Sequence, residues 1–272
     1  MPVRKKTETQ EIIIPEITKA QVSVNIVGTS PLIINSITDK AKRELLLPVS
    51  KSEKIKSSEP KHDPYTEFQN APYTLKKGPT LLAMPALAIK KAMMTAALDI
   101  PSTSKSAIGR LVYVVGDMLN VYGVPEMLIS VVRLAGIERT PDIRTRVIVP
   151  RWACIGIKIE FVTPFIKPNS IFNLVYAAGN TAGIGDWRPE KGSGSYGQFV
   201  TVNDDDPELI SIVNSGGREA QIKAMKNPKP YDEETEKWYE WAQSELRNRG
   251  YKKITVDEDE EDDEDEEEQG SE

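Results

Sequence analysis

The chain has 272 residues, among them 35 basic residues, 41 acidic residues and a single cysteine, Cys154. All the basic residues precede Asp257 and 13 acidic residues lie at or after it, so the first 256 residues hold 28 acidic against 35 basic residues, a net charge of +7. This composition excludes an internal disulfide and, because no apolar run is long enough, a membrane-spanning helix. A cytoplasmic location is expected.

Residues 1–19 predict a flexible arm without a secretory signal peptide, because no apolar core segment follows their basic residues. Residues 21–27, Gln-Val-Ser-Val-Asn-Ile-Val, alternate polar and apolar side chains and predict a half-buried strand. Ser36 and Asp39 have the spacing of a capping box, so a helix is expected to begin there and to end before Pro48.

Residues 48–80 predict a long inserted loop, because Lys, Ser, Pro and Tyr are frequent and no period is visible. A helix is then expected from Pro85, with an apolar stripe that reaches Leu98. Segments dense in β-branched residues follow. The strands that they predict are residues 111–115, 128–134, 145–149 and 153–162.

A short helix is expected from Asn169 or Ser170 to Ala178, closed by Gly179 at its C-terminal cap. A strand over residues 198–202 follows the intervening glycine-rich segment. Together these elements predict one core domain, residues 20–202, interrupted by the insertion.

The chain after residue 202 predicts a helical extension that ends at residue 256. One helix is expected after Asp206, and another over residues 231–249, which are acidic at the start and basic at the end. Residues 257–268 are twelve consecutive acidic residues, which repel one another and can bury nothing. We therefore expect residues 257–272 to form a disordered acidic tail.

The order strand, helix, helix, strands, helix, strand predicts an α+β fold of the ferredoxin-like or RRM-like type. Such a core has an antiparallel sheet with helices on one face, here with inserted loops and a C-terminal helix added. The free face of such a sheet is a common platform for single strands of nucleic acid.

The segment from Gly183 to Phe199, Gly-Ile-Gly-Asp-Trp-Arg-Pro-Glu-Lys-Gly-Ser-Gly-Ser-Tyr-Gly-Gln-Phe, interleaves five glycines with aromatic and basic residues. Glycines let a backbone approach a ligand, cations suit phosphates, and aromatic faces suit stacked bases. This glycine loop therefore predicts a nucleic-acid-binding site. Its expected binding residues are Gly183, Gly185, Trp187, Arg188, Lys191, Gly192, Gly194 and Tyr196.

A second basic cluster contains Arg139, Arg144 and Arg146. Along a strand Arg144 and Arg146 point to the same face, and paired guanidinium groups bind phosphate in bidentate fashion. The same arginines could equally pair with Asp142 and nearby glutamates as solvent-facing ions. The sequence leaves these two interpretations open.

Enzymatic chemistry finds little support in the sequence. Residues 192–197 match G-x-G-x-x-G, but a strand is expected after them instead of the helix that a dinucleotide fingerprint requires. His62 is the only histidine and Cys154 the only cysteine, far from it in the sequence, so a zinc site or a Ser-His-Asp arrangement would need unusual partners. His62 is therefore expected at the surface. We expect no catalytic residue, no metal site and no cofactor.

The remaining candidates are expected to have structural roles. Cys154 lies in an alternating apolar stretch and is expected to be buried and inert. Trp152 is expected in the core, and Trp238 and Trp241 are expected to form a packing stripe on the last helix.

The spacing Gly183-Ile-Gly185, Gly192-Ser-Gly194 and Gly197-Gln-Phe199, after a helix and before a final strand, resembles the glycine-rich loop of the RAMP superfamily, which includes the Cas7-type backbone subunits of CRISPR complexes. The same loop, together with Ser30-Pro-Leu-Ile-Ile34 and Asp39-Lys-Ala-Lys-Arg43, is also similar to uncharacterised bacteriophage and prophage proteins. These resemblances imply an RRM-like protein whose subunits assemble along nucleic acid. The acidic tail differs from Cas7 proteins and is similar to the tails of phage single-stranded DNA-binding proteins, which recruit replication enzymes.

These observations predict a non-enzymatic single-stranded nucleic-acid-binding protein of phage replication or recombination, located in the host cytoplasm. Single-stranded DNA is favoured over RNA, although the sequence does not separate the two. The expected partners are the strand, further copies of the chain, and replication or recombination proteins that the tail recruits; no membrane is expected. The alternative is a phage assembly protein that uses the glycine loop as a subunit contact.

Overall fold

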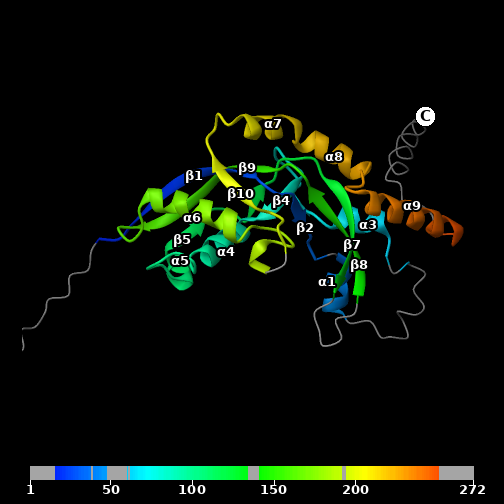
Figure 1. Cartoon of the computed structure of the whole chain (residues 1–272), viewed down its shortest axis with the longest axis horizontal. Helices are drawn as coiled ribbons and strands as arrows, with labels where there is room; N and C mark the ends of the chain where they lie inside the picture. The colour runs from blue at the N-terminus through cyan, green and yellow to red at the C-terminus, as the bar shows by residue number, and fades with distance from the viewer. Residues whose placement is uncertain are drawn as a thin grey trace, which may run out of the picture.

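The computed structural model describes residues 16–37, 39–47, 60, 62–133, 141–191 and 194–250. It is a mixed α+β structure with antiparallel sheets (Figure 1). Most of the expected N-terminal arm, and the whole acidic tail, lie outside the described residues.

The central sheet has the strand order β10-β1-β9-β5, and all three pairings are antiparallel. In β1 the expected alternation is present, since Val24 and Ile26 are buried whereas Gln21 and Ser23 are exposed. The strands are β1 (Thr18–Gly28), β5 (Val112–Val114), β9 (Ala153–Thr163) and β10 (Phe199–Val202).

Two helices cover one face of this sheet, and they also pack on each other. They are α4 (Ala86–Ala96) and α6 (Pro168–Thr181). Figure 1 shows both on the same side of the sheet, with α7 (Pro207–Ser215) on the opposite side. In chain order the central elements are β1, α4, β5, β9, α6 and β10.

Two smaller sheets extend the central one. The first has the order β2-β8-β7 and is built around the long β7–β8 hairpin, and the second has the order β3-β4-β6. The strands of the first are β2 (Leu32–Ile34), β7 (Glu126–Arg133) and β8 (Pro141–Val149). Those of the second are β3 (Tyr73–Thr74), β4 (Leu82–Pro85) and β6 (Met118–Asn120).

The prediction of a loop over residues 48–80 was wrong for its second half, which contains α3 (Pro64–Asn70) as well as β3. The Asp63 carboxylate accepts a hydrogen bond from the Tyr65 amide at 3.1 Å, and Pro64 occupies the first helical turn. These are ordinary helix-start signals, and buried Phe68 anchors the helix. The earlier residues of the insertion, apart from Pro60, lie outside the described residues.

Two further boundaries differ from expectation. Helix α5 (Lys105–Leu111), capped by Ser104, occupies the start of the expected strand at residue 111. Gly179 lies inside α6, which continues to Thr181, and a glycine is needed there because a side chain would overlap the Phe199 carbonyl of β10. The expected helix after Ser36 is present as α1 (Asp39–Leu46).

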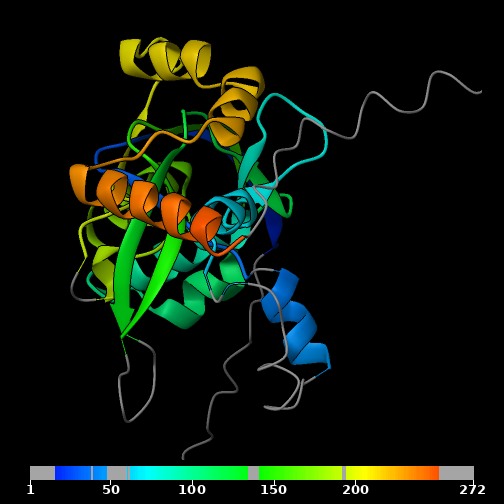
Figure 2. The ribbon, with the colours of Figure 1, turned by 90° about the vertical axis from the view of Figure 1, so that its right-hand side faces the viewer.

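The C-terminal extension contains α7, α8 (Arg218–Lys226) and α9 (Glu233–Asn248). The side chains of Asp206 and Asp232 cap α7 and α9 by accepting backbone hydrogen bonds at 2.9 Å and 2.8 Å. Figure 2 shows α9 crossing in front of β7 and β8. In the part of the chain that the structure describes, no helix is long and apolar enough to cross a membrane.

The packing surface of α9 differs from the expected tryptophan stripe. Trp238 is 41% exposed and Trp241 58% exposed, with their rings edge to face at 6.0 Å. The helix instead packs through buried Thr235 and half-buried Tyr239. The expectation for these two tryptophans was therefore wrong.

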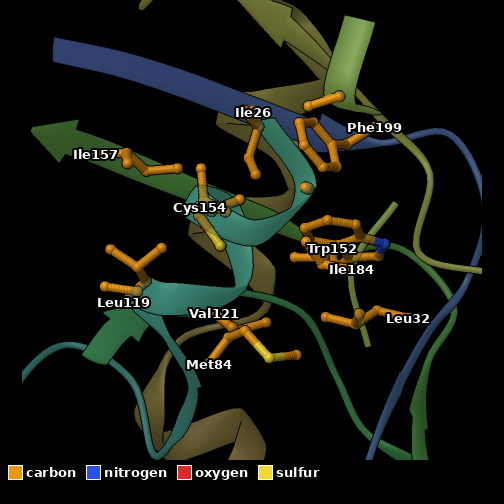
Figure 3. Close-up of a cluster of buried hydrophobic side chains, with 14 of the residues drawn as sticks. Ile26, Leu32, Met84, Leu119, Val121, Trp152, Cys154, Ile157, Ile184 and Phe199 are labelled. Carbon is orange, nitrogen blue, oxygen red and sulfur yellow. The ribbon is translucent and has the colours of Figure 1, made fainter. Parts of the chain in front are cut away.

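The main core lies between the central sheet, its helices and the first smaller sheet. Trp152, just before β9, is fully buried, meets Phe199 edge to face at 6.1 Å, and donates a hydrogen bond to the Ser30 carbonyl at 2.8 Å. Figure 3 shows Cys154 among apolar side chains of this core. Burial raises the pKa of the Cys154 thiol to about 12, so both residues are core residues as expected.

Candidate nucleic-acid interface

The glycine loop packs on one face of the sheet β2-β8-β7. Ile33, Leu128 and Ile148 form an apolar cluster on that face, and the half-buried rings of Trp187 and Tyr196 pack against it. The two rings are 5.9 Å apart and tilted relative to each other. Two of the expected base-stacking residues are therefore brought together, each with part of its surface against the sheet.

Backbone hydrogen bonds fix the loop to β2 and to itself. The Asp186 amide donates to the Ile33 carbonyl at 3.0 Å, and the Gly197 amide donates to the Pro31 carbonyl at 2.8 Å. Across the loop, the amide of Tyr196 donates to the carbonyl of Trp187 at 3.2 Å. These hydrogen bonds hold the described part of the loop against β2.

The glycines of the loop are needed for this packing. Gly183, Gly185 and Gly197 have positive φ angles of 66°, 80° and 68°. A side chain at Gly197 would overlap the Ile184 carbonyl, and one at Gly194 would overlap the Trp187 carbonyl. Close approach between the loop's own segments accounts for these glycines without a ligand.

Arg146 lies beneath this loop. Its guanidinium carbon is 4.6 Å from the centre of the Trp187 ring, and only 7% of its side chain is exposed. Nε is 3.6 Å from Asp186 Oδ2, too far for a hydrogen bond, and Nε and Nη1 are buried without a hydrogen-bond partner. Burial lowers the pKa of Arg146, the Asp186 carboxylate partly opposes this, and Arg144 adds to it.

Arg144 and Arg146 lie two residues apart on β8, opposite Ser130 and Leu128 of β7. Alternation along the strand places both arginines on the face that carries Trp187. Arg144 is exposed, and its Nη2 lies 3.2 Å from Asp142 Oδ2. The buried Ser130 hydroxyl, opposite Arg144, has no hydrogen-bond partner. The sequence left phosphate binding and ion pairing open for these arginines. Arg144 forms an ion pair with Asp142, whereas Arg146 has donors without a hydrogen-bond partner.

His62 was expected to be a surface residue, but it is partly buried and contacts two carboxylates. Its Nδ1 lies 2.6 Å from Glu67 Oε1 and its Nε2 lies 3.1 Å from Asp142 Oδ1. The other oxygen of Glu67 accepts the Thr145 amide at 3.0 Å. These contacts join the α3 region to β8, the strand that carries Arg144.

Arg188, an expected phosphate ligand, is engaged inside the loop. Its Nη1 donates to the Gly185 carbonyl at 2.8 Å and its Nε donates to Glu190 Oε2 at 2.7 Å. Glu190 Oε1 accepts a hydrogen bond from Thr95 of α4 at 2.9 Å. Burial acts to raise the pKa of Glu190, but the hydrogen bonds from Arg188 and Thr95 and the nearby cations outweigh it and lower that pKa. Arg188 therefore braces the loop against α4.

Of the other expected site residues, some are described by the structure and others are not. Lys191 is exposed at the end of a short 3-10 turn, Pro189–Lys191. Arg139 and Gly192 lie outside the described residues. The structure adds Asp186, Ser130 and Asn35, whose amide nitrogen lies 3.4 Å from Asp186 Oδ2. The only sequence signal for Asn35 is its place directly after the buried Leu-Ile-Ile of β2.

The described part of the site carries cations, aromatic rings and the carboxylates of Asp186 and Glu190. Among the residues that the structure describes, no three His, Cys, Asp or Glu side chains are grouped so that they could hold a metal ion. No protein-family model matches the chain, and no curated protein has a matching sequence. The geometry alone must therefore support a function.

Proposed function

We propose that this chain is a non-enzymatic single-stranded nucleic-acid-binding protein of phage replication or recombination. The observation that carries the proposal is Arg146, a buried guanidinium beneath Trp187 with two unpaired nitrogens, beside the exposed Arg144. An unpaired buried donor destabilises the fold by about 1–3 kcal/mol. The two unpaired nitrogens of Arg146 therefore favour a role in binding a ligand. A strand phosphate would replace Asp186 as the counter-ion, which requires the Trp187 ring that covers Arg146 to shift and expose the two buried nitrogens.

The aromatic and basic side chains nearby suit the other parts of a strand. Trp187 and Tyr196 are only half-buried, and Lys191 is an exposed cation on the same loop. A base stacked on an aromatic ring contributes roughly 1–3 kcal/mol, more than an exposed ion pair. The combination supports binding through both phosphates and bases.

We further propose that the core is ferredoxin-like, of the RRM and RAMP type. Its support is the chain order β1-α4-β5-β9-α6-β10, combined with the spatial order β10-β1-β9-β5, in which the last strand of the unit lies beside the first. The preference for DNA, the phage origin and assembly along the strand rest on the resemblances of the glycine loop and of the acidic tail.

The proposal is tested by fluorescence anisotropy of labelled single-stranded DNA, single-stranded RNA and duplex DNA. We expect salt-sensitive binding with a preference for a single strand, because counterions are released when phosphates are neutralised. Arg144→Ala should weaken this binding. Arg151→Ala is the matched control, since exposed Arg151 pairs with Glu208 of α7 at 2.9 Å, away from the loop. Absence of binding at low salt, or equal losses in both variants, would contradict the proposal.

The second candidate is an assembly protein, and exposed aromatic side chains favour it. Phe172 and Tyr176 lie four residues apart on α6 and are 39% and 52% exposed, and Trp238 and Trp241 are exposed on α9. Such side chains are frequent at protein interfaces. Large oligomers without nucleic acid, together with no strand affinity, would favour this alternative.

A further inference from the structure

A hollow of about 370 Å³ lies between the start of α4, the end of β2 and the glycine loop. Its size falls at the lower end of small-molecule sites, roughly 300–1,000 Å³. Its apolar wall includes Met84, Leu87 and Ile184, contributed by β4, α4 and the loop. Figure 1 shows α4 running alongside the loop that leads from α6 to β10.

The polar groups of the hollow are mixed in sign. Lys91 is exposed and has no ion pair among the described residues, whereas Asp186 contributes a carboxylate that is 38% exposed. Arg188 and Glu190 also line the hollow but neutralise each other at 2.7 Å. Two carboxylates disfavour an isolated phosphate, and two cations disfavour a metal ion. A flat, uncharged ligand with donors and acceptors along one edge fits this lining.

Asp186 connects the hollow to the arginine site. Its Oδ2 is 3.6 Å from Arg146 Nε and 3.4 Å from the Asn35 amide nitrogen, and both Asn35 and Asp186 line the hollow. If a phosphate of a nucleic-acid strand contacts Arg146, a neighbouring nucleotide of that strand can therefore reach the mouth of the hollow.

We propose that the hollow receives one unstacked nucleobase of the bound strand. This inference rests on the proposed function and deepens it. The base lies against the apolar wall, and Asn35, Lys91 and Asp186 meet its polar edge, as unstacked bases are commonly recognised in single strands. The loop then contacts the strand on two sides, with a phosphate at Arg146 and a base beside α4.

The test uses nucleoside 5′-monophosphates and saturation-transfer NMR with the full chain. Transfer to the base protons is expected for the wild type and lost in Leu87→Trp, which fills the mouth of the hollow. Leu98→Trp is the matched control, because Leu98 is similarly exposed, follows α4 and does not line the hollow. No transfer in the wild type, or equal transfer in both variants, would overturn the inference.

Strand binding is measured in parallel, with 2-aminopurine at one position of a labelled single strand. An unstacked base in the hollow raises the 2-aminopurine fluorescence of the bound strand, and Leu87→Trp removes this rise. Strand binding without the rise or the transfer rejects the hollow and leaves the proposed function. Transfer to mononucleotides without strand binding rejects the proposed function and leaves the hollow as a nucleotide site.

Discussion

At the residue scale, the surroundings of Arg146 are those expected of a ligand-binding cation under the proposed function. Its charge is desolvated, its nearest carboxylate lies at 3.6 Å, and two of its nitrogens have no hydrogen-bond partner. A cation kept for stability would have these donors paired, since unpaired buried donors are costly. The stacking with Trp187 offsets part of this cost.

Arg146→Met should therefore separate binding from stability. We expect the free energy of unfolding to stay within about 1 kcal/mol of the wild type or to rise, because an apolar chain of similar length avoids the desolvation of the charge. Strand affinity should fall about tenfold or more, since a charge-assisted hydrogen bond contributes about 1.5–3 kcal/mol. Urea unfolding and anisotropy check the two effects. Lost stability with unchanged affinity would make Arg146 a structural cation.

Gly197 and Gly156 form a natural pair for testing the loop. Both have positive φ angles, 68° and 64°, but a side chain at Gly197 meets the Ile184 carbonyl, whereas one at Gly156 meets open space. Gly156→Ala should cost about 1–2 kcal/mol from backbone strain alone. Gly197→Ala should cost clearly more in the same urea titration. Equal costs would mean that the loop adjusts without loss.

Cys154 provides a test of core burial. Because burial raises the pKa of its thiol to about 12, the thiolate is nearly absent at pH 8 in the native protein. In the unfolded protein the pKa of the cysteine thiol is about 8.5. A thiol reagent at pH 8 should therefore label the native protein only through unfolding and label it fully in urea. The raised pKa also means that stability falls as pH rises from about 8.5 towards 12. Rapid labelling of the native protein would contradict this burial.

At the element scale, local signals predicted those elements that carry their own caps or alternation. The strand around Val24, the helix after Asp206 and the last helix after Asp232 follow from residues close together in the sequence. The small sheet β3-β4-β6 could not be predicted in this way. Its strands are two to four residues long, and the pairing of β4 with β6 joins residues more than thirty positions apart, such as Ala83 with Asn120.

In the candidate site, too, features that depend on local sequence were predictable and features that depend on tertiary contacts were not. The loop, Arg144 and Arg146 were predictable because composition and strand alternation are local. The engagement of Arg188 by Glu190, and the link from Glu190 to Thr95, required the position of α4 against the loop. The use of the glycines for packing was hidden for the same reason, because it depends on contacts made only in the folded chain, such as Gly197 with the Ile184 carbonyl and Gly185 with the Ile33 carbonyl of β2.

Helix α8 illustrates an element held by one buried side chain. Gln221 is fully buried, accepts the amides of Leu81 and Leu82 at 2.7 Å and 2.9 Å, and donates to the carbonyls of Val121, Gly123 and Gly216. Gln221→Leu should lower the free energy of unfolding by about 3 kcal/mol or more, because it leaves several backbone groups unpaired.

The control is Gln198→Leu, which removes one exposed hydrogen bond, to the Asn180 carbonyl at 2.9 Å. It should cost no more than about 1.5 kcal/mol. Chemical denaturation of both variants measures the difference. A small effect of Gln221→Leu would show that α8 is only loosely attached to β4 and β6.

At the scale of the whole molecule, charge is divided between two parts of the chain. The first 256 residues carry 35 basic and 28 acidic residues, whereas the last 16 carry 13 acidic residues and no basic one. Attraction between the two parts is strongest where salt does not screen it, since the Debye length shortens from about 30 Å at 0.01 M to about 10 Å at 0.1 M. The tail and a strand would therefore compete for the same cations.

Truncation after Val256 should tighten strand binding at about 50 mM salt, and the gain should shrink at about 200 mM because screening weakens both the tail's competition and the strand's binding. Anisotropy of the full chain and of residues 1–256 measures the effect. A chain of full length with residues 257–268 changed to Asn and Gln separates charge from length, and it should behave like the truncated protein. If the truncated and full-length proteins bind equally at low salt, the tail does not occupy the site. Self-competition would then be excluded, because a competing polyanion acts most strongly where its attraction is least screened, whereas recruitment of another protein would remain as an expected role of the tail.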